Sequence, residues 1–133
     1  MTTKQKIKKQ ILLNVIKKRR PNLVLPELTS ENIDAIYREW ENLEDTEDDI
    51  TDCSEELRCS GINTDLPSPY SRHYEAQSVA TKLFDGTWVG WVYWYGGGKH
   101  GQPEYFDDWM DSAYALDCIE SEQMVIVRKF TKI

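Results

Sequence analysis

An Asp-Gly pair between two extended segments is the feature that most constrains the fold of this chain. Asp85-Gly86 separates residues 72–84 from residues 87–95, and the second of these segments is dominated by aromatic side chains and valine. An Asp-Gly pair at such a position favours a two-residue hairpin turn, because both central residues of that turn adopt positive φ. We therefore predict a β-hairpin in this part of the chain.

The second strand of this hairpin is expected to be apolar on both faces. Successive side chains of a strand point to opposite sides of the sheet. One face can pack on helices, so the other face needs cover from a further element, an oligomer or a partner. One face of the strand carries Trp88, Val92 and Trp94, and the opposite face carries Val89, Trp91, Tyr93 and Tyr95.

Two helices are predicted before the hairpin. Residues 4–18 place Ile7, Ile11 and Val15 at a four-residue step, which gives a helix with one apolar face and lysines on the other side. The second helix begins after Thr29 or Ser30, one of which supplies its N-cap. Its apolar residues have the spacing of a buried helical face: Ile33, Ile36, Tyr37, Trp40 and Leu43.

The region after the hairpin predicts one more helix and a closing strand. Pro103 suits the first turn of a helix, which we expect to run to about Asp117. Residues 123–131 are rich in β-branched and apolar side chains, which favours a strand. The expected buried face of the helix comprises Phe106, Trp109, Met110 and Ala113.

These elements together predict an α+β fold in which helices pack on one face of a small antiparallel sheet. The sheet is expected to contain the hairpin and the C-terminal strand. We expect residues 21–133 to form a single domain, with residues 1–20 as a basic amphipathic helical extension.

Charge is distributed very unevenly along the chain. The net charge is −7, yet residues 1–20 carry eight Lys and Arg and no acid, which leaves 8 bases against 23 acids in residues 21–133. The basic helix can dock on the body, lie on a membrane or in a partner's groove, or contact nucleic-acid phosphate. Docking on its own acidic body would explain the asymmetry without any partner.

Residues 39–56 contain ten acids and no base. Such a block is typical of a solvated loop or helix end, and the alternative is a contact surface for a basic partner. A calcium loop is not expected, because the glycine at the centre of that motif is missing. The candidate contact residues in this block are Glu47, Asp48, Asp49 and Asp52.

Residues 96–101 form a glycine-rich loop that contains Lys99 and His100. Backbone N–H groups in such a loop can bind an anion. His100 stands where a phosphate-binding loop needs Ser or Thr after the lysine, so that motif is absent. We expect a flexible connection, with anion binding or presentation of Lys99 and His100 to a partner as the alternatives.

The reactive side chains favour no catalytic or metal site. Cys53 and Cys59 are separated by five residues, more than the usual spacing of a structural zinc site, and a disulfide framework is not expected. His100 could act as a base, but Cys118 would lie too far along the predicted helix to be its nucleophile. We expect no cofactor, no metal and no enzymatic activity.

The segment Tyr93-Trp94-Tyr95-Gly96-Gly97-Gly98-Lys99-His100-Gly101, with Pro103-Glu104 and Trp109 after it, resembles a segment of small uncharacterised proteins of bacteria and their prophages. The resemblance covers about the last 60 residues. It implies an accessory protein of a phage or mobile element and supplies no functional residues.

The function that these observations favour is a non-enzymatic protein-interaction module, such as an acidic inhibitor or modulator of a nucleic-acid-processing host factor. A cytoplasmic location is expected, and a homodimer is compatible with the pattern. The alternative is a small-ligand or phosphate-binding protein, which could be an enzyme, centred on the glycine loop at residues 96–101. The predicted partner-binding residues are Glu47, Asp48, Asp49, Asp52, Trp91, Tyr93, Tyr95, Lys99 and His100.

Overall fold

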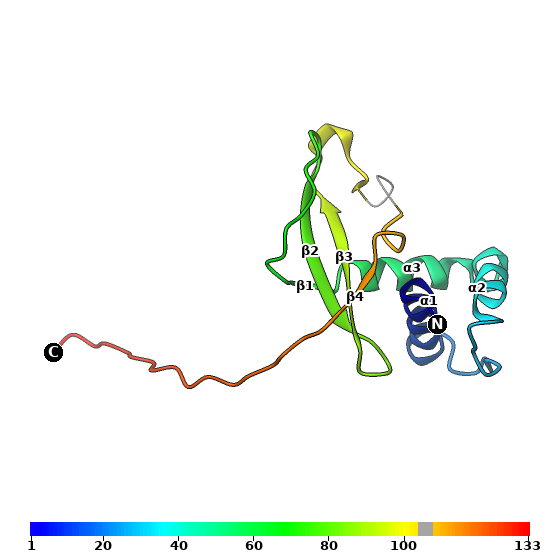
Figure 1. Cartoon of the computed structure of the whole chain (residues 1–133), viewed down its shortest axis with the longest axis horizontal. Helices are drawn as coiled ribbons and strands as arrows, with labels where there is room; N and C mark the ends of the chain where they lie inside the picture. Colours follow the sequence, from blue (N-terminus) through cyan, green and yellow to red (C-terminus); the bar gives the residue numbers. More distant parts are fainter. Residues whose placement is uncertain (104–107) are drawn as a thin grey trace.

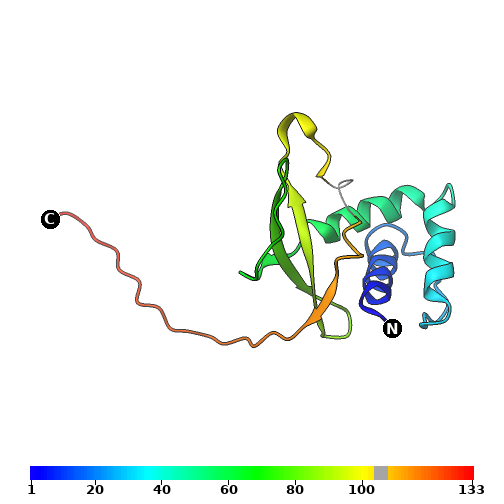
Figure 2. The ribbon, with the colours of Figure 1, turned by 45° about the horizontal axis from the view of Figure 1, so that its top comes forward.

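The computed structural model describes residues 1–103 and 108–133, which form three α-helices beside an antiparallel sheet. The helices lie on one side of the sheet, and the C-terminal segment extends away on the other side (Figures 1 and 2). The predicted α+β class, with helices packed on one face of a small antiparallel sheet, is confirmed. Within the described ranges, no helix has the length and apolar composition that a membrane crossing requires.

Helix α1 spans Thr3–Lys18 and begins at a capping box. The Thr2 hydroxyl accepts a hydrogen bond from the Gln5 backbone N–H, and the Gln5 side chain accepts one from the Thr2 backbone. This reciprocal pair satisfies two of the N–H groups that a helix start leaves without partners. Its apolar face is fully buried, so α1 is part of the core: Ile7, Ile11, Leu12 and Val15.

Helix α2 spans Ile33–Asn42, close to the predicted position. Thr29 and Asn32 exchange hydrogen bonds one turn earlier, where the Thr29 hydroxyl accepts from the Asn32 backbone at 3.3 Å and the Asn32 side chain accepts from the Thr29 backbone at 2.7 Å. The N-cap of the regular helix is Asn32, so the predicted N-cap at Thr29 or Ser30 is wrong, although the Thr29 side chain stabilises the turn that precedes the helix.

Helix α3 spans Glu47–Arg58 and lies within the acidic block, where sequence analysis favoured a loop or a helix end. Its first turn holds Glu47, Asp48 and Asp49, where carboxylates interact favourably with the helix dipole. Ile50, Cys53 and Leu57 are buried on its inner face. This i, i+3, i+7 spacing within the acidic block was the available signal for the helix.

The sheet contains four strands in the order β1-β2-β3-β4, and every neighbouring pair is antiparallel. Strands β2 and β3 form the predicted hairpin, and β1 and β4 are short edge strands. The bounds are β1 Ile62–Asn63, β2 Glu75–Lys82, β3 Trp88–Tyr95 and β4 Tyr114–Leu116, and a 3₁₀ turn η1 follows β3 at Gly98–His100.

The hairpin turn differs from the predicted two-residue type. The Gly86 N–H donates to the Leu83 carbonyl, and the Leu83 N–H donates to the Thr87 carbonyl, each at 2.9 Å. Only Gly86 adopts positive φ in this turn, whereas Asp85 does not. The loop therefore uses the longer form that ends on a left-handed glycine, and the Asp85 side chain accepts from Thr87 within it.

Two predictions for the C-terminal region are wrong. Residues 108–113 form turns and residues 114–116 form β4, so the helix expected as far as Asp117 is absent from residues 108–117; Phe106 lies outside the described residues. Residues 123–131 form no strand in this single chain, because they leave the body after β4 and pair with none of its described residues. The last strand is β4 instead.

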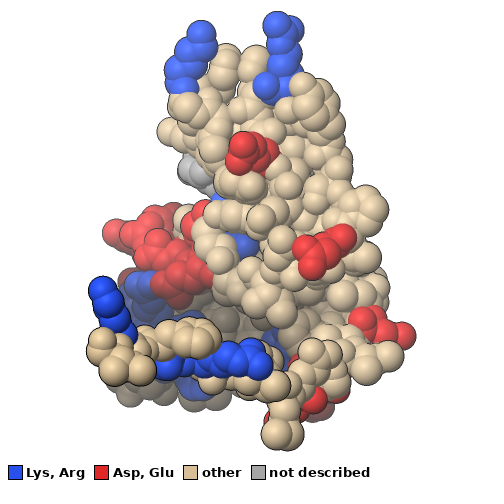
Figure 3. Space-filling model, turned by 90° about the vertical axis from the view of Figure 1, so that its left-hand side faces the viewer, with Lys and Arg blue, Asp and Glu red and all other residues tan. Residues whose placement is uncertain are grey.

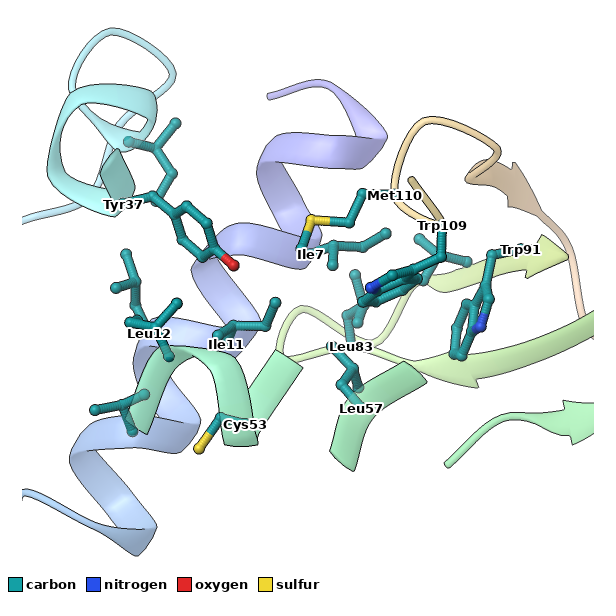
Figure 4. Packing of buried hydrophobic residues seen from close by; sticks show 14 of the residues in the cluster. Ile7, Ile11, Leu12, Tyr37, Cys53, Leu57, Leu83, Trp91, Trp109 and Met110 are labelled. Carbon is teal, nitrogen blue, oxygen red and sulfur yellow. The ribbon is translucent and has the colours of Figure 1, made fainter. Parts of the chain in front are cut away.

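The core joins the helices to one face of the sheet (Figure 4). Trp91 on β3 is fully buried and packs against Trp109 with ring centroids 5.1 Å apart. The Trp91 indole N–H donates to the Arg58 carbonyl at 3.2 Å, so its polar atom is satisfied as well. Trp109 and Met110 are buried as predicted, although they lie in a turn.

Candidate functional site

The structure separates the predicted partner-binding residues into three places. Glu47, Asp48, Asp49 and Asp52 lie on α3; Trp91, Tyr93 and Tyr95 share one face of β3; Lys99 and His100 lie in η1. Trp91 is inside the core, where no partner can reach it. The predicted residues therefore do not form one continuous surface.

The glycine loop is built by three consecutive glycines with positive φ, Gly96, Gly97 and Gly98. Gly97 lies against the Tyr74 ring, where an added Cβ would be 2.6 Å from a ring carbon. The Tyr74 hydroxyl donates to the His100 carbonyl at 3.1 Å, and the His73 and His100 rings are 3.9 Å apart. These contacts to residues 73 and 74 give the loop a defined conformation.

Neither of the two main cavities formed by the described residues lies where the ligand-binding alternative requires one. That hypothesis needs a cavity lined by Trp91, Tyr93 or Tyr95 beside the loop. One cavity lies between the helices, and a second lies beside residues 86–89 and 115–118; neither contains these aromatic residues, and both Lys99 and His100 are exposed. Among the described residues, no cluster of three or more His, Cys, Asp and Glu side chains is placed to hold a metal ion.

The basic charges of the N-terminal region are largely used inside the molecule. Arg20 pairs with Asp49 at 2.7 Å, and Arg19 pairs with Asp52 at 3.5 Å and also with Glu56. Six of the eight bases form such ion pairs, and Lys9 lies over the Phe84 ring. The six are Lys4, Lys6, Lys8, Lys18, Arg19 and Arg20.

These ion pairs account for the uneven distribution of charge along the chain. The basic helix docks on its own acidic body, and its apolar face is buried there. Two of the four predicted acidic contact residues, Asp49 and Asp52, are ion-paired with it. Glu47 and Asp48 form no ion pair among the described residues, so they are better placed to meet a partner.

A cleft of about 790 Å³ lies between α1, α2, α3 and the turn at residues 108–110. Its apolar lining comes from Tyr37, Ile50, Trp109 and Met110, which also belong to the core. The remaining lining is polar and charged. Its acids are Asp34, Glu41, Asp52, Glu55 and Asp108, and its bases are Lys4, Lys8 and Arg38.

Tyr37 is the most perturbed titratable group of the cleft. Burial raises the pKa of its hydroxyl strongly, and the nearby Glu41 carboxylate raises this pKa further, whereas a hydrogen bond with Ser54 opposes the shift. The hydroxyl points from α2 toward α1 (Figure 4). Tyr37 is therefore protonated at neutral pH, and it can donate a hydrogen bond but cannot act as a base.

Ion pairs on one side fix the wall of the cleft. Lys8 donates to Asp34 at 2.9 Å, which lowers the pKa of this carboxyl group, and a second hydrogen bond from Gln5 lowers it further. Lys4 donates to Asp111 at 2.6 Å and lies 3.7 Å from Asp108. Glu41 forms no ion pair within the part of the chain that the structure describes.

Six acids near the α2–α3 corner form no ion pair among the described residues. We call this set the acidic corner: Glu39, Glu41, Glu44, Asp45, Glu47 and Asp48. Sequence analysis identified the acidic block but not the cleft beside it, because Tyr37, Ile50, Trp109 and Met110 come from distant parts of the chain. Their apolar spacing indicated burial and gave no sign that one edge remains open.

The three cysteines are free, and none lines this cleft. Cys53 is buried, and burial raises the pKa of its thiol. Burial also raises the pKa of Cys59, whose thiol donates to Glu55 at 3.3 Å. Both thiols are therefore weaker nucleophiles at neutral pH than an ordinary cysteine.

A buried arginine connects α3 to the sheet. Arg58 donates to the Trp94 carbonyl and to Glu55, and its guanidinium group lies 4.8 Å from the centre of the Tyr93 ring. Tyr93 in turn stacks on Tyr95 at 5.6 Å. These contacts give two of the predicted aromatic contact residues a structural role, with the Tyr93 ring against a buried charge.

The sheet face opposite the helices is mostly uncharged (Figure 3). Acids gather at one side of this view, and single acids lie elsewhere on it. Trp88, Val92, Tyr114 and Leu116 are half-buried on this face, and Ile62 is exposed. The prediction that β3 is apolar on both faces agrees with this arrangement.

Comparison with protein-family models, with curated proteins and with solved structures finds no match for this chain.

Proposed function

We propose that this protein is a protein-binding module that holds a basic, partly apolar segment of another protein in the cleft between its helices. The observation that carries the proposal is an open cleft of about 790 Å³ with apolar residues in its lining and the acidic corner at its edge. An apolar floor provides binding energy, while the charged rim selects the sign of the partner.

The floor supplies the residue types that dominate protein interfaces. Tyr37, Trp109 and Met110 line the cleft with the small part of their surface that the core leaves exposed, and aromatic residues and methionine are enriched where proteins meet. Their buried portions hold them in place, so little side-chain entropy remains to be lost when a partner binds.

The acidic corner adjoins the cleft through Glu41, which belongs to both. Because its six acids form no ion pair among the described residues, their charge is available to attract a basic partner. Such a field raises the rate of association and makes binding sensitive to salt. If the chain is the accessory protein that its glycine-loop segment implies, binding of this kind would inhibit or modulate a host protein.

The proposal is tested by capture and titration with two matched variants. The first carries Glu41→Gln, Glu44→Gln, Glu47→Gln and Asp48→Asn, which neutralise most of the acidic corner without breaking an ion pair of the fold. The control carries Glu27→Gln, Glu31→Gln and Asp65→Asn, three exposed acids that do not line the cleft. A third variant, Met110→Lys, places a charge on the floor.

We expect a protein captured by the wild type to bind directly in titration, with affinity that falls as salt rises. The acidic-corner variant and Met110→Lys should each weaken this binding at least tenfold, while the control leaves it within about twofold. Equal binding by all four proteins would refute the cleft as the site, and so would failure to capture any direct binder. Circular dichroism verifies that Met110→Lys remains folded.

A further inference from the structure

The C-terminal segment, residues 119–133, leaves a row of apolar side chains in water. Val125, Ile126 and Val127 are 77%, 75% and 86% exposed, and Phe130 is 87% exposed. Figures 1 and 2 show this segment running away from the body as an extended chain. A contiguous run of exposed apolar residues with strand-forming side chains is a surface that another chain can cover.

The sheet of the same chain offers the segment no strand to continue along. Strand β4 is antiparallel to β3, and Leu116 at the end of β4 pairs with Trp88, the first residue of β3. A chain that continues beyond Leu116 in the same direction therefore passes the end of the sheet at the hairpin turn. The backbone groups of residues 119–133 form no hydrogen bond with the described part of the body, so they are open to water or to another chain.

The order of charges along the segment is complementary to itself in the antiparallel direction. Glu120 and Glu122 precede the apolar residues 124–127, and Arg128, Lys129 and Lys132 follow them. Two copies laid antiparallel place the acids of each beside the bases of the other. A parallel arrangement would put like charges opposite each other, which destabilises a strand pair.

We propose that residues 119–133 of two copies of this chain pair as antiparallel strands around a two-fold axis at Val125. In this register Met124 lies opposite Ile126, and Glu122 lies opposite Arg128, once on each side of the axis. Opposite residues share a face of the ribbon, so the apolar and the charged pairs form on the same face. The interface is isologous, as two-fold symmetry requires.

A second copy fits these charges better than the body of the same chain. A fold-back onto β4 would bring the segment against residues 111–118, which contain Asp111 and Asp117 but no base. Glu120 and Glu122 would then gain no partner, and Asp111 is already paired with Lys4. The proposed dimer uses a surface other than the cleft and does not depend on the proposed function.

The test uses charge reversal on the full chain, read by sedimentation velocity over a range of concentrations. Glu122→Lys and Arg128→Glu each place like charges in both cross-strand pairs, so each variant should dimerise roughly tenfold or more weakly than the wild type. An equimolar mixture of the two variants restores both pairs, so it should associate as a heterodimer about as tightly as the wild type. Lys132→Glu is the matched control, since no base or acid faces it in this register.

The mixture separates pairing between copies from every arrangement within one chain. Recovery of the dimer on mixing supports the proposal, because folding back would not respond to a second variant. A wild-type chain that stays monomeric at about 0.5 mM would overturn it. So would variants that dimerise like the wild type, or a mixture that associates no better than either variant alone. Loss of the dimer in Lys132→Glu but not in Arg128→Glu would overturn the Glu122–Arg128 pair.

Discussion

Helix α1 and the C-terminal segment carry similar apolar residues but meet opposite environments. In α1, Ile7, Ile11 and Val15 are fully buried by the body, and most of the surrounding bases are paired with its acids. In the C-terminal segment, Val125, Ile126 and Val127 are mostly exposed. The difference shows that one chain completes its helical core by itself and leaves the C-terminal apolar surface without a partner.

The reason lies in how each element satisfies its backbone. A helix makes its hydrogen bonds within itself and needs only a place for its apolar face. An extended segment needs a neighbouring strand for its hydrogen bonds as well as cover for its side chains. The short β4 ends where β3 begins, so the described residues of the chain provide no neighbouring strand for residues 119–133.

The largest expected effect is the difference in stability between the same substitution, isoleucine to alanine, made in α1 and in the C-terminal segment. Ile11→Ala should lower the free energy of unfolding by about 2–5 kcal/mol, because it leaves a cavity in the core. Ile126→Ala should change it by less than about 0.5 kcal/mol in a solution dilute enough to hold monomers. Urea denaturation measures both. Equal losses in the two variants would show that the C-terminal segment is packed within the monomer.

A second prediction concerns β4, the strand from which the C-terminal segment leaves the body. A Cβ added at Gly90 would lie 2.7 Å from atoms of both Tyr114 and Leu116. Gly90→Ala should therefore cost about 1–3 kcal/mol of stability and loosen β4, as overpacking does. Denaturation and exchange of the β4 amides provide the measurements. If the contact is the cause, Leu116→Ala in the same chain should recover part of the loss, whereas additive losses would contradict it.

The smallest expected effect involves Asp85, which connects the hairpin turn to α1. Its carboxylate accepts from the Thr87 hydroxyl at 2.6 Å and pairs with Lys6 at 3.0 Å. The Thr87 hydrogen bonds, and then Lys6, lower its pKa from 3.8 to about 2. Because the folded state holds the charged form, this stability is fully present above about pH 4 and is lost as pH falls toward 2.

Asp85→Asn should therefore cost about 1 kcal/mol near pH 7, a modest value because the pair is near the surface. The difference from the wild type should shrink as pH falls from 4 to 2, which denaturation at a series of pH values would reveal. A difference independent of pH would contradict the assignment. The matched change Glu122→Gln, in the exposed C-terminal segment, should leave the stability of the monomer unchanged across this range.

The elements that sequence analysis predicted well are those whose signal is local. The Asp85-Gly86 pair located the hairpin, and the four-residue step from Ile7 located α1. The turn type was wrong, because a left-handed Gly86 also suits a longer loop. Helix α3 was missed because its ten-acid surroundings outweighed the spacing of Ile50, Cys53 and Leu57, although its first acids stabilise the start of the helix.

The cleft and the open C-terminal segment could not be predicted from local patterns. Tyr37, Ile50 and Met110 meet only through tertiary packing, and their apolar character is equally typical of a closed core. Residues 123–131 have the composition of a strand, but composition does not say whether the neighbouring strand belongs to the same chain. The docking of the basic helix was left open for the same reason, and ion pairs such as Arg20–Asp49 decide it.

Hydrogen exchange at several protein concentrations compares α1 with residues 124–130 directly. Amides of α1 should be protected at every concentration, because its core is complete in one chain. Amides of residues 124–130 should exchange freely in dilute solution and become protected as the concentration rises and two copies pair. Protection of residues 124–130 that is the same at all concentrations would contradict this view, and so would free exchange at every concentration.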